Sequence, residues 1–191
     1  MYLCTQLKSV TMYRKIFALS ILAALSLSAM AETNEPVQAA LPHKVCNVTI
    51  KTLHGEVADL PYFGEKNLFM FYIDPDTGLT GNKNYKYSDI LEEKGVTNGP
   101  NMYGFGVLNL KDTALPKSIV RAMARHRTAK NNGFVMDDSN HVIRDAWQLG
   151  DCNGKFCFMI ITKEGELIFF QKEEMDKQAQ VEFLDWVEQY R

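Results

Sequence analysis

The chain has 191 residues, which is enough for one domain with a substantial hydrophobic core. Hydrophobic residues make up 46% of it and aromatic residues 11%, a composition that excludes an intrinsically disordered protein. With 21 basic and 23 acidic residues the net charge is −2, which argues against a general nucleic-acid-binding protein.

The first 31 residues have the features of a secretory signal peptide. Arg14 and Lys15 precede an apolar run over residues 16–27, and an Ala-x-Ala sequence follows at 29–31. A run of this length is too short to span a bilayer, which needs roughly 20 apolar residues. We therefore expect cleavage after residue 31, a periplasmic location and no stable membrane anchor after cleavage. Met12, just before the charged pair, is an alternative start.

Residues 32–44 are polar and contain two prolines, which predicts a flexible linker before a domain over residues 45–191. Residues 45–52 alternate between apolar and polar side chains, which predicts a strand with Cys46 facing the core. Residues 56–60 are a candidate partner strand. The run Leu-Phe-Met-Phe-Tyr-Ile at 68–73 is unbroken and apolar, as is typical of a strand buried on both faces.

A turn, Asp-Pro-Asp-Thr-Gly at 74–78, follows this buried strand. Sites in α/β folds collect at the carboxyl ends of central strands, so Asp74, Asp76 and Thr77 are candidate binding-pocket residues. Their oxygens suit a hard cation, but Asp and Gly are also common in ordinary turns. The four histidines share no zinc-site spacing with the cysteines, so we expect neither a metal nor a cofactor.

The next third of the chain predicts a loop at 79–87, a short helix at 88–94 capped by Ser88, a buried strand at 103–110 and a helix at 113–130. In the last of these, Ile119, Val120 and Met123 make up the expected core-facing side. A stripe of cations lies on another side, at Lys117, Arg121 and Arg125. This stripe is either a solvated face or a docking surface for an acidic partner or an anionic ligand.

The last third predicts a strand at 134–136, a helix after Ser139, strands at 156–161 and 167–170 joined by a turn, and a final helix capped by Asp176. Strands that alternate with helices indicate an α/β layer structure. A central mixed sheet flanked by helices, ending in a β-hairpin and a helix, is typical of the thioredoxin fold.

Cys152 and Cys157 flank an Asn-Gly turn that can bring their sulfurs together. A structural disulfide is the favoured interpretation, and closing so short a loop contributes only about 2 kcal/mol in the chain-entropy model. Two free thiols and a redox-active pair are the alternatives. The pair is therefore also the candidate for catalysis, if the protein is an enzyme at all.

Three segments, 137–142, 146–149 and 159–167, together resemble the second half of a peroxiredoxin-type thioredoxin fold. The sequence Arg-Asp-Ala-Trp-Gln-Leu at 144–149, the segment 107–116 and the signal peptide are most similar to the YtfJ family of periplasmic proteins. This resemblance implies a periplasmic thioredoxin-like domain without an established activity.

The chain departs from that superfamily at its redox site. Where thioredoxins and peroxiredoxins carry the attacking cysteine, residues 74–78 contain none, and Cys157 occupies the place of the cis-proline. A cis bond before a non-proline residue costs about 2.5–4 kcal/mol, so we expect a trans bond there. We predict a non-catalytic module that binds an unknown periplasmic protein or small ligand. The alternative is a thiol-disulfide oxidoreductase that uses Cys152 and Cys157.

Overall fold

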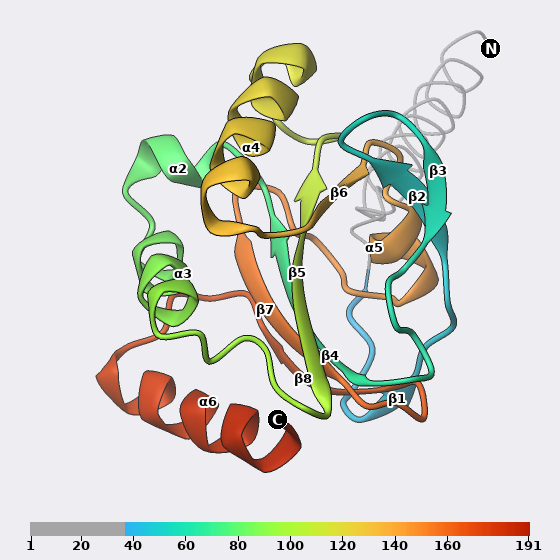
Figure 1. Ribbon diagram of the computed structural model, residues 1–191, viewed down its shortest axis with the longest axis vertical. Coiled ribbons are helices and arrows are strands. Elements are labelled where there is room, and N and C mark those ends of the chain that lie inside the picture. The colour runs from blue at the N-terminus through green and yellow to red at the C-terminus, as the bar shows by residue number, and fades with distance from the viewer. Residues whose placement is uncertain (1–36) are drawn as a thin grey trace, which may run out of the picture. The chain divides into compact units, whose positions relative to one another are not determined.

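An eight-stranded mixed sheet organises residues 37–191, the part of the chain that the computed structural model describes (Figure 1). The predicted signal peptide lies outside these residues. The strands are β1 (His43–Lys44), β2 (Thr49–Thr52), β3 (Val57–Asp59), β4 (Asn67–Ile73), β5 (Met102–Asn109), β6 (Val135–Asp138), β7 (Phe156–Ile161) and β8 (Glu166–Gln171). The helices are α2 (Thr77–Thr80), α3 (Lys83–Glu93), α4 (Lys117–Asn131), α5 (Val142–Ala146) and α6 (Lys177–Tyr190).

The strands lie in the order β1-β8-β7-β4-β5-β6-β2-β3. β4, β5 and β6 run parallel, because the helices α3 and α4 carry the chain back between them. β7 is antiparallel to β4, and β8 to β7, which is the terminal hairpin that the sequence predicts. The predicted α/β class with a central mixed sheet is confirmed.

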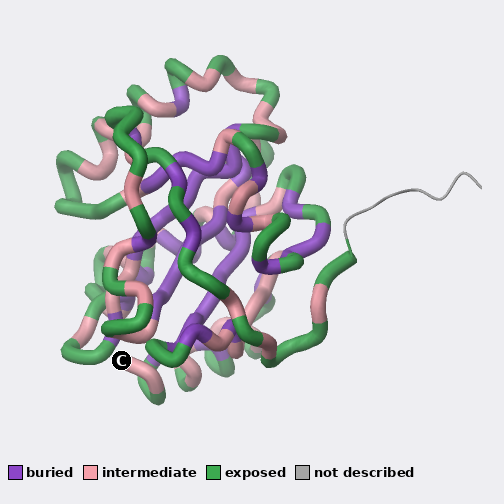
Figure 2. The backbone as a smooth tube through the Cα atoms, turned by 90° about the vertical axis from the view of Figure 1, so that its right-hand side faces the viewer, coloured by how far each residue is buried: buried purple, intermediate pink, exposed green. Residues whose placement is uncertain are grey.

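β4 is central because both of its faces are apolar, as its unbroken hydrophobic run predicts. Leu68, Met70 and Tyr72 point into one core, which is covered by α5 and by the fully buried Trp147 that follows it. Phe69 and its neighbours on the other face pack against α3 and α6. Figure 2 shows the central strands as the most continuously buried part of the backbone. The loops at their ends are therefore the places where polar groups can gather.

The region predicted as a loop at 79–87 is instead mostly helical. α3 begins at Lys83, because the side chain of Asn82 accepts hydrogen bonds from the backbone N–H groups of Asn84 and Tyr85. Ser88, the predicted cap, lies inside this helix and donates to the Tyr85 carbonyl at 2.7 Å. A strong Asn cap six residues upstream therefore decides where the helix begins.

The N-terminal part of the domain also differs from prediction. β2 starts only at Thr49, so Cys46 precedes the strand and is exposed, not part of the core. Contacts with the domain extend into the predicted linker, since Gln38 bridges Leu149 and β1 pairs with β8. No helix within residues 37–191 is both long and apolar enough to cross a membrane.

Candidate functional site

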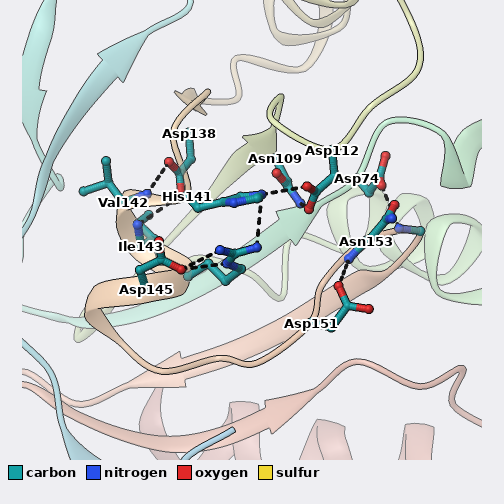
Figure 3. A network of polar contacts seen from close by, with 12 residues as sticks. Asp74, Asn109, Asp112, Asp138, His141, Val142, Ile143, Asp145, Asp151 and Asn153 are labelled. Carbon is teal, nitrogen blue, oxygen red and sulfur yellow. Dashed lines mark hydrogen bonds and ion pairs between the residues drawn. The ribbon is translucent and has the colours of Figure 1, made fainter. Parts of the chain in front are cut away.

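Polar side chains gather where the three parallel strands end, and Figure 3 shows this network from close by. Because β4, β5 and β6 run in the same direction, their carboxyl ends meet at one edge of the sheet. Asp74 follows β4, Asn109 ends β5 and Asp138 ends β6. All three side chains are at most 1% exposed, so each needs a partner inside the protein.

Asp74 is held by backbone N–H groups from two different loops. Its carboxylate accepts hydrogen bonds from Gly154 N at 2.7 Å and Asp76 N at 3.0 Å. Burial raises the pKa of this carboxyl group, and the two N–H donors offset part of that effect. Asp74 N also donates to the Lys155 carbonyl at 2.9 Å, so the turn after β4 is fastened to the loop before β7.

The other two predicted pocket residues also serve the turn itself. Asp76 accepts hydrogen bonds from the Thr113 hydroxyl at 2.6 Å and from Ala114 N at 2.9 Å, which ties α2 to the loop before α4. Thr77 is buried and donates to the Asp74 carbonyl at 2.6 Å. The three predicted residues are thus together in space, but their contacts are to the protein's own backbone and side chains.

A second group, Asn109, Asp112, His141 and Arg144, was not predicted. The Asn109 amide donates to Asp112 at 2.7 Å, and the other oxygen of that carboxylate lies 2.8 Å from His141 Nε2. Arg144 Nη1 lies 3.4 Å from the same ring nitrogen, and Arg144 Nη2 pairs with Asp145 at 2.7 Å. The side chains of His141 and Asp112 are 10% and 15% exposed, so they form the solvent side of the network.

Asp138 links this edge to the interior of the protein. It accepts hydrogen bonds from Val142 N at 2.7 Å and Ile143 N at 3.0 Å, and so caps the first turn of α5. It also accepts from the Tyr72 hydroxyl at 3.1 Å. Burial, followed by the charge of Asp138, raises the pKa of Tyr72 far above its ordinary value, so this phenol remains a proton donor.

Cys152 and Cys157 lie next to each other, but both are free thiols. The favoured disulfide is therefore absent from this structure. The Asn-Gly turn does bring the two thiols close together, as predicted. Cys157 lies opposite Tyr72 in the sheet, and both cysteines are 0% exposed. Burial raises the pKa of the Cys157 thiol, so the reactive thiolate is disfavoured.

The peptide bond before Cys157 is trans, as expected, since the one cis bond in residues 37–191 precedes Pro42.

The predicted basic stripe is only partly exposed, because α4 is rotated relative to the expectation. Arg121 Nε donates to the buried Asp137 at 2.6 Å, and Arg125 donates to the Leu53 carbonyl at 2.9 Å. Lys117, in the first turn, is half-buried. Of the expected apolar side only Val120 is buried, while Ile119 and Met123 are 53% and 64% exposed. Two of the three proposed docking residues therefore hold the helix to the sheet.

No group of three or more His, Cys, Asp or Glu side chains in the described part of the chain is arranged to hold a metal ion. The network is rich in acceptors, and its donors are backbone N–H groups, hydroxyl groups, one amide and one guanidinium. Such an arrangement can bind a ligand that donates hydrogen bonds. The sequence carried a signal for the missed residues, because Asn109 and Asp138 follow apolar runs just as Asp74 does.

No family model matches the chain, and no curated protein is similar to it in sequence. Solved structures do match. The pneumococcal exposed lipoprotein thioredoxin of Streptococcus pneumoniae is 13% identical with a TM-score of 0.54, over 74% of this chain and 99% of that one. A peroxiredoxin-like protein from Aquifex aeolicus is 11% identical with a TM-score of 0.50, over 78% and 88%. At these identities the likeness concerns the fold alone, and it establishes that the chain has a thioredoxin-like fold.

Proposed function

We propose that this protein is an exported, periplasmic member of the YtfJ family that binds a ligand at the carboxyl ends of β4, β5 and β6 without thiol chemistry. The signal-like segment over residues 1–31 supports export, and the similarity of residues 107–116 and 144–149 supports the family. The polar network in Figure 3 lies where ligands bind in open α/β sheets.

One observation carries the non-catalytic assignment. The turn after β4, where thioredoxin-like enzymes hold an attacking thiol, contains Asp74 to Gly78 and no cysteine. The carboxylate in that turn is buried and accepts two backbone hydrogen bonds. A reactive thiol must instead be accessible and readily deprotonated, and neither condition holds for Cys157, which is buried and has a raised pKa.

The test is a pair of turnover assays on the purified protein, insulin reduction and peroxide consumption. We expect no turnover above that of a variant with both Cys152→Ser and Cys157→Ser. A thioredoxin assayed in parallel shows that the conditions support turnover. Activity that is present in the native chain and lost in the double variant would overturn the proposal.

A second candidate function is thiol-disulfide exchange by the cysteine pair, and the contact between the two thiols favours it. In that reaction Cys152 attacks a partner's disulfide, Cys157 then displaces the partner's thiolate, and the protein is left with an internal disulfide. Cys152 is the candidate attacking thiol because its loop includes the exposed residues Asp151 and Asn153, whereas Cys157 lies within β7. Trapping of a mixed disulfide in Cys157→Ser, but not in Cys152→Ser, would support this candidate.

A further inference from the structure

The side-chain oxygen of Asn109 is the one buried side-chain polar atom in residues 37–191 that has no hydrogen-bond partner. The residue is fully buried, at the last position of β5. Its amide orientation follows from its neighbour, because the opposite orientation would place the oxygen against the Asp112 carboxylate, 2.7 Å away. A buried acceptor without a partner is unfavourable, so a ligand that donates a hydrogen bond to this oxygen would be stabilised.

The surroundings of this oxygen are predominantly acidic. Figure 3 shows the Asn109 amide beside the Asp112–His141 pair, with Asp74 on one side and Asp138 on the other. Asp112 is the carboxylate within hydrogen-bond distance of this amide, while the guanidinium of Arg144 is already paired with Asp145. His141 is the remaining group that can carry a positive charge, and it is shared with Asp112. A ligand that donates a hydrogen bond here is therefore favoured electrostatically when it carries a positive charge.

We propose that this position binds the primary ammonium group of a small ligand, with Asn109 Oδ1 as one acceptor and Asp112 as the source of the opposite charge. The proposal rests on the proposed function, because it names the ligand class of that same site. An ammonium group carries three N–H donors and one charge, which matches a neutral acceptor next to a carboxylate.

Two features of the structure distinguish an ammonium group from other occupants. A divalent metal needs several converging ligands, and no such group of His, Cys, Asp or Glu is present in the described residues. An amine needs only acceptors at hydrogen-bond distance. A small ligand also suits the access to this position, because the neighbouring side chains of His141 and Asp112 are only 10% and 15% exposed.

The experiment is a titration of the purified protein with methylammonium chloride at constant ionic strength, followed by thermal unfolding and by the side-chain amide resonance of Asn109. We expect the Tm to rise with concentration and the Asn109 resonance to move. Tetramethylammonium has the same charge without N–H groups, and acetamide has N–H groups without charge. We expect neither to reproduce the effect.

Asn109→Leu removes the acceptor, and Asn153→Leu is the matched control at an exposed position on the rim of the network. We expect the apparent Kd for methylammonium to rise about tenfold or more in Asn109→Leu and to stay unchanged in Asn153→Leu. Equal effects of tetramethylammonium, a response to Ca²⁺ that exceeds the amine response, or no response at Asn109 would each overturn the proposal. None of those results changes the outcome of the insulin and peroxide assays. A wrong ligand class can therefore be told apart from a wrong non-catalytic assignment.

Discussion

Arg121→Met is the change that best tests the observed orientation of α4. Arg121 bonds Asp137 through both Nε and Nη2 at 2.6 Å, and Nη2 also donates to the Ser139 hydroxyl at 3.2 Å. The side chain of Asp137 is 1% exposed and that of Arg121 is 30% exposed. Methionine keeps much of the apolar stem of arginine and removes the charge, so the variant isolates the loss of the ion pair.

The expected cost follows from this burial. Breaking a fully buried ion pair by removing one partner costs about 3–5 kcal/mol, because the other charge is left without compensation. Partial exposure of Arg121 lets water replace some of the lost interaction, and the Ser139 hydroxyl still donates to Asp137. We therefore expect the free energy of unfolding to fall by roughly 2–3 kcal/mol.

Urea denaturation measures this change as a lower midpoint with an unchanged slope. The matched control is Lys117→Met on the same helix, a residue for which the described structure contains no ion pair, and we expect a change within about 0.5 kcal/mol. Combining Arg121→Met with Asp137→Asn should restore part of the lost stability, since no unpaired charge is then buried. Equal, small changes in the free energy of unfolding of the Arg121 and Lys117 variants would refute the reasoning. Arg121 would then again be a candidate docking residue.

Two further predictions concern Asp74 and the cysteines. Burial raises the folded-state pKa of Asp74 above its ordinary value of 3.8, so the folded protein retains a proton that the unfolded chain has released. The stability that this group contributes therefore falls as pH rises from about 3.8 towards the raised pKa. Asp74→Asn should flatten that part of a plot of unfolding free energy against pH. An unchanged slope in the variant would contradict the assignment. In the native protein Cys46 should react quickly with a thiol reagent, whereas Cys152 and Cys157 should react only after unfolding, because Cys46 is exposed and the others are buried. In a double variant with Cys46→Ser and Cys152→Ser, fast reaction of Cys157 with the reagent would show that Cys157 is not buried.

The sequence by itself determined those elements whose apolar pattern fits one kind of secondary structure with one buried face or pair of faces. The run at 68–73 is apolar at every position, which favours a strand buried on both faces, and its carboxyl end locates the turn at 74–78. The hairpin from β7 to β8 and the face of α6 that carries Phe183 and Val187 follow in the same way from local periodicity. These features depend on neighbours in the chain.

Only the tertiary structure decided the rotation of α4 and the composition of the polar network. The pattern of α4 allows either side to face the sheet, and the buried carboxylate of Asp137 selects the side with Arg121, although Ile119 and Met123 are then exposed. Asn109 and His141 are 32 residues apart in the sequence and meet around Asp112 because β5 and β6 end at the same edge. Contacts of this kind depend on strand order and direction, which no local pattern encodes.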